Sequence, residues 1–155
     1  NDERCIFFAR GVLETVKKLR WTPDIIYCSG WMSALVPLYI KTAYNDTPFF
    51  SGTKVVLSLD NEEYATPFSP KFVDKILIDG MLQSSVRSIA GLPVGYEDLM
   101  RLAIDNSDAV VLDAPNVNTR VYNYLHNSGK LILPYSEDNN KEEFLAFCNS
   151  LLSAE

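Results

Sequence analysis

Apolar residues in the first twenty positions recur at spacings of three and four, which is the period of a helix with one buried face. Ile6, Ala9, Leu13 and Val16 belong to this stripe, and Pro23 lies just beyond it. Because proline stops a helix, the spacing predicts a helix over residues 3–19.

The remainder of the chain alternates short apolar runs with helical patterns. Residues 24–28 form a β-branched run between Pro23 and Ser29-Gly30, and a helical pattern over residues 31–44 follows at once. We expect further strands over residues 54–59, 108–112 and 130–133, and further helices over residues 96–106, 117–125 and 141–152. Strands that alternate with helices indicate an α/β fold, in which helices cover both faces of a parallel sheet.

Residues 61–95 interrupt this alternation. Prolines and glycines divide them into short apolar pieces, in which we expect one or two short helices. This excursion leaves from the carboxyl end of the second strand, and open α/β sheets bind ligands at that edge. It is either a lid over a site or a decoration of the sheet edge.

Composition limits the number of domains and the kind of partner. The chain has 155 residues, of which 47% are hydrophobic and 22% charged, as in one soluble globular domain. A formal net charge of −6 repels phosphate backbones, so we expect no nucleic-acid partner. No apolar stretch approaches the roughly 20 residues that a membrane helix needs, so we expect no membrane span.

Three cysteines, Cys5, Cys28 and Cys148, lie in apolar stretches and form no Cys-x-x-Cys pair. We interpret them as buried thiols in a reducing compartment, which predicts a cytoplasmic protein.

The first residue is not methionine and no leader pattern follows it, so residue 1 is either a processed end or the edge of a longer chain. Residues 151–155, a helical pattern with a short polar tail, are typical of a natural end.

Several kinds of site are excluded by what the sequence lacks. His126 is the only histidine, and with three scattered cysteines it cannot complete a zinc site at a usual spacing. We expect it to be solvated near the end of its helix, where a cation is favoured. The glycines stand alone rather than in a phosphate-binding loop, so we expect neither a metal nor a cofactor.

Two groups of residues near the carboxyl edge of the predicted sheet carry candidate chemistry. Asp60-Asn61-Glu62-Glu63 follows the second strand and offers carboxylates for acid/base work or for a divalent cation; the alternative is a solvated loop. Trp31, Tyr64 and Phe68 form either a platform for stacking sugar rings or part of the core.

A longer motif lies over the first predicted strand and the helix after it. Trp21, Pro23 and Asp24 precede two isoleucines, Trp31 follows the strand, and the next helix carries Leu35-Val36-Pro37-Leu38-Tyr39-Ile40-Lys41. This arrangement resembles the bacterial glycogen and starch synthases, which are retaining glucosyltransferases that use ADP-glucose. Their motif reads Trp-x-Pro-Asp, two aliphatic residues, His-x-His-Asp-Trp, and then Leu-x-Pro-x-Tyr-Leu-Lys.

The likeness extends upstream to residues 4–14 and downstream to residues 53–61, and it is looser beyond Tyr64. It implies the N-terminal half of a GT-B transferase, a Rossmann-like parallel sheet with helices on both faces, lacking the first strand of the family. It also implies a single Rossmann-like domain over residues 1–155, without the C-terminal domain that binds the donor in the family.

The sequence departs from the family motif where the chemistry of the family lies. Tyr27-Cys28-Ser29-Gly30-Trp31 stands where the family has His-x-His-Asp-Trp, Asp60-Asn61 where it has His-Asn, and Asp113-Ala114-Pro115 where it has Ser-Pro. A retaining glucosyl transfer needs cations or N–H donors that stabilise the leaving diphosphate. We therefore expect no turnover from this chain by itself, and we assign it no catalytic residue.

Two interpretations follow from the resemblance and its departures. The chain is either a glycogen synthase-like glucosyltransferase domain of glucan biosynthesis or a non-catalytic regulatory module that binds a glucan or a protein. The expected partner is an α-glucan or malto-oligosaccharide, with no ADP-glucose binding by this chain alone; a protein partner or a second copy stays open.

We expect Gly30 to begin a helix whose free N–H groups bind an anion or a sugar hydroxyl. The candidate ligand-binding residues follow the first two strands and are Ser29, Gly30, Trp31, Asp60 and Asn61.

Overall fold

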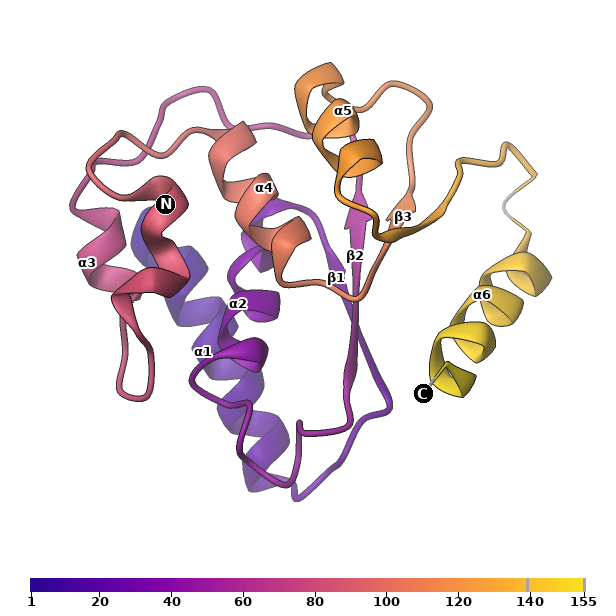
Figure 1. The fold of residues 1–155 in the computed structure, drawn as a ribbon, viewed down its shortest axis with the longest axis horizontal. Coiled ribbons are helices and arrows are strands. Elements are labelled where there is room, and N and C mark those ends of the chain that lie inside the picture. Colours follow the sequence, from indigo (N-terminus) through magenta and orange to yellow (C-terminus); the bar gives the residue numbers. More distant parts are fainter. Residues whose placement is uncertain (139, 155) are drawn as a thin grey trace.

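A four-stranded parallel sheet runs through the centre of the molecule (Figure 1). The computed structural model describes residues 1–138 and 140–154. The strands lie in the order β1-β2-β3-β4, so each pairs with the next one along the chain. The α/β class with a parallel sheet is confirmed. The strands are β1 (Ile25–Ser29), β2 (Lys54–Leu59), β3 (Ala109–Leu112) and β4 (Leu131–Leu133).

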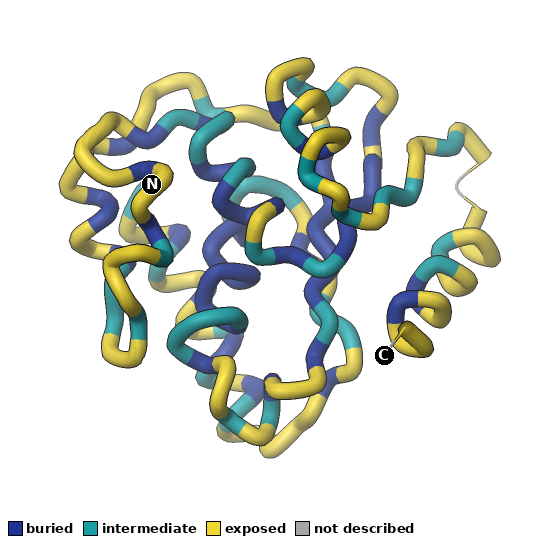
Figure 2. The backbone as a smooth tube through the Cα atoms, viewed as in Figure 1, coloured by how far each residue is buried: buried dark blue, intermediate teal, exposed yellow. Residues whose placement is uncertain are grey.

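One face of the sheet packs against a layer of helices and forms the main core. The predicted stripe of the first helix, Cys5, Ala9, Leu13 and Val16, is at most 8% exposed and shares this core with Leu57 of β2. Figure 2 shows the buried interior between these helices and the strands. The helices of this layer are α1 (Asp2–Lys18), α2 (Leu35–Lys41), α4 (Tyr96–Asp105) and α5 (Thr119–Asn127).

The opposite face packs against α6 (Lys141–Ser153), which stands apart from the other helices in Figure 1. Leu151 is buried against Val56 and Val111, and Cys148 is the second buried residue of this helix. Helices therefore lie on both faces, as predicted. Because α6 buries only these two side chains, it contributes a much smaller apolar contact than the layer on the other face.

The helix predicted over residues 31–44 is divided into two elements. A three-residue 3₁₀ helix, η1 (Trp31–Ser33), comes first, and the α-helix begins only at Leu35. Pro37 explains the break because it has no N–H to donate to the carbonyl of Ser33, as a continuous α-helix would require. A proline is tolerated in the first turn of a new helix, which is where α2 places it.

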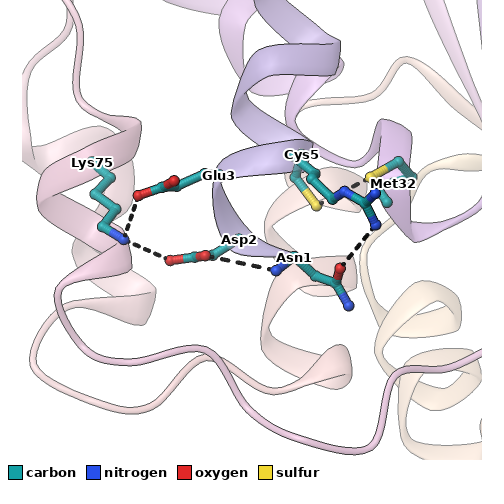
Figure 3. A network of polar contacts seen from close by, with 7 residues as sticks. Asn1, Asp2, Glu3, Cys5, Met32 and Lys75 are labelled. Atoms are coloured by element: carbon teal, nitrogen blue, oxygen red, sulfur yellow. Dashed lines mark hydrogen bonds and ion pairs between the residues drawn. The ribbon is translucent and has the colours of Figure 1, made fainter.

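The excursion over residues 61–95 is anchored on the start of α1. The Nζ atom of Lys75 lies 2.9 Å from a carboxylate oxygen of Asp2 and 3.2 Å from one of Glu3 (Figure 3). The prediction of one or two short helices is confirmed. These helices are α3 (Phe72–Ile76) and η2 (Gln83–Ile89).

The cysteines and the histidine take structural positions. All three cysteines are free and buried, as predicted. Burial raises the pKa of Cys28 to about 12 and that of Cys5 to about 11, so both stay protonated at neutral pH. His126 is exposed in the last turn of α5, where its ring packs on that of Tyr122 with centroids 4.2 Å apart.

Candidate functional site

The loops that follow β1 and β2 meet at the carboxyl edge of the sheet. Ser29 and Ser58 are register partners, so the two strands end side by side. A Cβ atom on Gly30 would lie 3.6 Å from Oδ2 of Asp60, which shows how closely the loops approach. That this edge binds a ligand stays a prediction. The structure brings together the predicted ligand-binding residues Ser29, Gly30, Trp31, Asp60 and Asn61.

Local hydrogen bonds hold the carboxylates of the second loop. Oδ1 of Asp60 accepts a bond from the backbone N–H of Glu62 at 2.9 Å, and Oε1 of Glu63 accepts one from the side-chain amide of Asn118 at 3.0 Å. Within residues 1–138 and 140–154, no group of three or more His, Cys, Asp or Glu side chains could hold a metal ion. These contacts favour the solvated loop over the cation site.

Gly30 adopts a backbone conformation that is almost restricted to glycine, with φ 77° and ψ 169°. The helix that follows it has only three residues, so its N-terminus lacks the aligned peptide dipoles of a longer helix. The carboxylate of Asp60 close by adds a negative charge that repels anions. Gly30 does precede a helix, as predicted, but the short helix and the carboxylate of Asp60 disfavour an anion there; binding of a sugar hydroxyl stays a prediction.

Trp31, Tyr64 and Phe68 pack against one another near this edge. The rings of Tyr64 and Phe68 stack with centroids 4.5 Å apart and an interplanar angle of 8°, and Trp31 meets Tyr64 edge-on at 5.0 Å. Phe68 is 7% exposed, and the hydroxyl of Tyr64 donates to the carbonyl of Val94 at 3.0 Å. Because the stacked faces of Tyr64 and Phe68 are used for packing, these two rings belong to the core, whereas a role of the half-buried Trp31 in binding stays a prediction.

Tyr27, Ser58 and Asp113 form a hydrogen-bonded group that is not among the predicted site residues. The hydroxyl of Tyr27 donates to Oδ2 of Asp113 at 2.5 Å, and the hydroxyl of Ser58 donates to the same oxygen. Burial and then the hydrogen bond to Asp113 raise the pKa of Tyr27 to about 12, so its phenol stays protonated at neutral pH. All three residues lie on the face toward α6, but strand alternation assigns a face only within each strand and does not show that the three strands lie side by side.

A cleft of about 750 Å³ opens beside this group, between the carboxyl edge of the sheet and α6. Tyr27 and Asp113 form its wall on the sheet side, and residues 133–137 and the first turn of α6 form the other walls. The ring of Tyr27 meets that of Phe144 edge-on, with centroids 5.6 Å apart and an angle of 89°.

Comparison with known proteins covers three quarters of the chain. The family described as the starch synthase catalytic domain matches residues 1–117. This chain belongs to that family. The match includes β1, β2 and β3, and therefore the candidate edge, whereas β4 and α6 lie beyond it.

The similar proteins with curated descriptions are glycogen synthases. That of Chlorobium luteolum is 42% identical over 103 residues, which are 63% of this chain and 21% of that protein. That of Thermotoga petrophila is 44% identical over 71 residues, 46% of this chain and 15% of that protein. That of Chlorobium limicola is 51% identical over 61 residues, 39% of this chain and 12% of that protein. The chain thus spans at most 21% of the length of these relatives. No solved structure matches it.

The lengths and hydropathy of the helices bear on whether this chain could span a membrane. Across the part of the chain that the structure describes, none of the helices is long and apolar enough to cross a bilayer.

Proposed function

We propose that this chain serves glucan biosynthesis as a glycogen synthase-like glucosyltransferase domain that binds an α-1,4-glucan and does not by itself transfer glucose from ADP-glucose. The glucan lies, in this proposal, across the loops after β1 and β2. The observation that carries it is the close approach of Gly30 and Asp60 within a chain of the starch synthase catalytic domain family.

The chemistry of these two loops suits a neutral ligand rich in hydroxyl groups. Ser29 and Asn61 are exposed and offer a hydroxyl and an amide, and Asp60 adds a carboxylate acceptor. Residues 29–34 and 60–70 contain no lysine or arginine. A nucleoside diphosphate needs cations or convergent N–H donors, so these loops favour the glucan over the sugar nucleotide.

The replaced motif supports binding without turnover. Ser29 and Gly30 stand where the glycogen and starch synthase motif has histidine and aspartate. A serine hydroxyl is shorter than an imidazole and glycine has no side chain, so neither can reach a leaving group as the family residues do. The same observation favours a second candidate, a non-catalytic module that binds a glucan or a protein and modulates a synthase.

Calorimetric titration at low salt, with maltoheptaose and separately with ADP-glucose, tests the proposal. We expect saturable heat with maltoheptaose and none with ADP-glucose. We also expect no incorporation of labelled glucose from ADP-glucose into glycogen by the chain alone. Measurable transfer would refute the proposed inactivity, and the absence of heat with maltoheptaose would refute glucan binding and move the search to protein partners.

Variants locate the glucan. Asn61→Ala is expected to raise the Kd for maltoheptaose about threefold to tenfold, the equivalent of one lost hydrogen bond. Asn45→Ala, an exposed asparagine in the loop that leads into β2 at the other end of the strand, should leave the Kd unchanged. If the wild type and Trp31→Ala bind maltoheptaose with equal affinity, and thermal melting shows that the variant is folded, Trp31 is not part of the site.

A further inference from the structure

The cleft beside α6 is separate from the loops to which the glucan is assigned. Its walls come from Tyr27 on β1, Asp113 after β3, residues 133–137 after β4 and the first turn of α6. Its volume of about 750 Å³ falls within the roughly 300–1,000 Å³ that is typical of small-molecule sites.

Aromatic side chains give this cleft flat apolar surfaces. Tyr27 and Tyr135 are 42% and 40% exposed, and the half-buried ring of Phe144 supports Tyr27 edge-on. The face of an aromatic ring carries partial negative charge, which attracts the weakly positive C–H groups on the face of a sugar ring. Such contacts bind a sugar without requiring a charge on it.

The carboxylate of Asp113 offers a hydrogen-bond acceptor to the cleft. Oδ2 of Asp113 receives the bonds from Tyr27 and Ser58, whereas Oδ1 receives no bond from any residue that the structure describes. A free carboxylate oxygen accepts a hydrogen bond from a ligand hydroxyl and orients the sugar.

The charges in the cleft select against anions. Asp113, Glu137 and Glu143 contribute three carboxylates to the lining, and Lys141 contributes one ammonium group. This excess of negative charge disfavours phosphorylated sugars and nucleotides. A neutral sugar has hydroxyl donors for the carboxylates and carries no charge to be repelled.

We propose that this cleft is a second carbohydrate site, which holds a glucosyl unit between Asp113 and α6. The choice of a glucosyl unit rests on the proposed function, whereas the choice of a neutral sugar rests on the cleft itself. Tyr27 and Asp113 depart from the family motif, and the walls after β4 and on α6 lie beyond the residues that match the family. A chain with two glucan sites would hold a polymer at two points, which raises avidity without new contacts at either site.

Chemical-shift mapping of the ¹⁵N-labelled chain with maltotriose tests the two sites separately. We expect saturable shifts of the amides of Tyr135, Ser136 and Phe144, which report the cleft. Shifts at Gly30 and Asn61 report the proposed function. Shifts confined to the cleft amides would support the cleft site and refute glucan binding at the loops after β1 and β2. Shifts confined to Gly30 and Asn61 would support the proposed function and refute the cleft site.

Matched variants distinguish a built site from surface adhesion. Tyr135→Ala is expected to raise the Kd measured at the cleft amides about fivefold to tenfold, since it removes one stacking surface. Tyr122→Ala removes a tyrosine that is 39% exposed on α5, away from the cleft lining, and should leave that Kd unchanged. Equal effects of the two variants would overturn the assignment.

Two further ligands test the chemical class. Glucose 6-phosphate should shift the cleft amides less than glucose at the same concentration, because the carboxylates repel its phosphate. Calcium chloride should leave the chemical shifts of the cleft amides unchanged. Stronger binding of the phosphate, or calcium-dependent shifts without a response to maltotriose, would show that the cleft is an ion site and overturn the proposal.

Discussion

The phenol of Tyr27 donates a hydrogen bond to the carboxylate of Asp113, which lies 86 positions later in the chain. Both residues stand where the sequence departs from the glycogen and starch synthase motif, Tyr27 in place of a histidine and Asp113 in the segment that replaces Ser-Pro. Tyr27 and Ser58 both donate to the same oxygen of this exposed carboxylate. The two departures therefore form one interaction rather than two unrelated losses.

Asp113→Asn is expected to lower the pKa of Tyr27. Burial is the main cause of its rise to about 12, and the hydrogen bond to the charged carboxylate is the next. Removal of the charge leaves the burial, so the pKa should fall but stay above the ordinary value of about 10. Carbon-13 NMR of labelled tyrosine, assigned with Tyr27→Phe, measures the midpoint. An unchanged midpoint would show that Asp113 does not act on this phenol.

The raised pKa of Tyr27 also predicts how the free energy of unfolding changes at alkaline pH. Its folded-state pKa of about 12 exceeds the unfolded value, so its contribution to stability is complete below about pH 10 and is lost as the pH rises toward about 12. Urea unfolding should therefore show a steeper loss of stability over this window for the wild type than for Tyr27→Phe. Parallel pH profiles for the two proteins would contradict the assignment.

Gly30→Ala is expected to lower the free energy of unfolding by about 1–3 kcal/mol, because a side chain is strained at φ 77° and ψ 169°. Gly11 in α1 offers the matched control, since a Cβ there would meet nothing within 4 Å. Gly11→Ala should raise the free energy of unfolding by about 0.5–1 kcal/mol through helix propensity. Urea denaturation measures both changes, and the same sign for both would show that the strain argument fails.

Phe68→Ala is expected to cost about 3–5 kcal/mol of unfolding free energy, since Phe68 is 7% exposed between the rings of Tyr64 and Phe72. Phe7→Ala is the control because Phe7 is 81% exposed on α1, and its cost should stay within about 0.5 kcal/mol. Thermal and urea unfolding compare the two variants. Equal costs would mean that the aromatic cluster does not hold the excursion in place.

The local pattern of the sequence predicts most of the fold. The strand expected over residues 54–59 is β2 without any change, and the first strand is displaced by one position. Hydrophobic periodicity is decided by neighbours in sequence, so it locates elements well. It failed over residues 31–44, where the missing N–H of Pro37 outweighs the apolar pattern and breaks the helix.

The cleft could not be predicted in the same way. The contact between Tyr27 and Asp113 depends on the order of the strands in the sheet and on which residues of β1 and β3 share a face. Neither relationship is encoded in the spacing of residues along one segment. The position of α6 over that face adds a third long-range condition, so only the folded arrangement reveals the cleft.

Cys148 is expected to react with a thiol reagent faster than Cys28, because α6 holds the sheet through few buried side chains. Cys148 and Leu151 are the buried residues of α6, whereas Cys28 lies in the main core under the helices of the other face. A helix held by few buried side chains detaches by local unfolding more often than the main core unfolds. Each detachment of α6 exposes the thiol of Cys148. Labelling with DTNB in native buffer, with peptide mass spectrometry, should show Cys148 modified first, and Cys148→Ser should abolish the fast phase. Labelling of all three cysteines at one rate would instead mean that α6 unfolds only together with the rest of the domain.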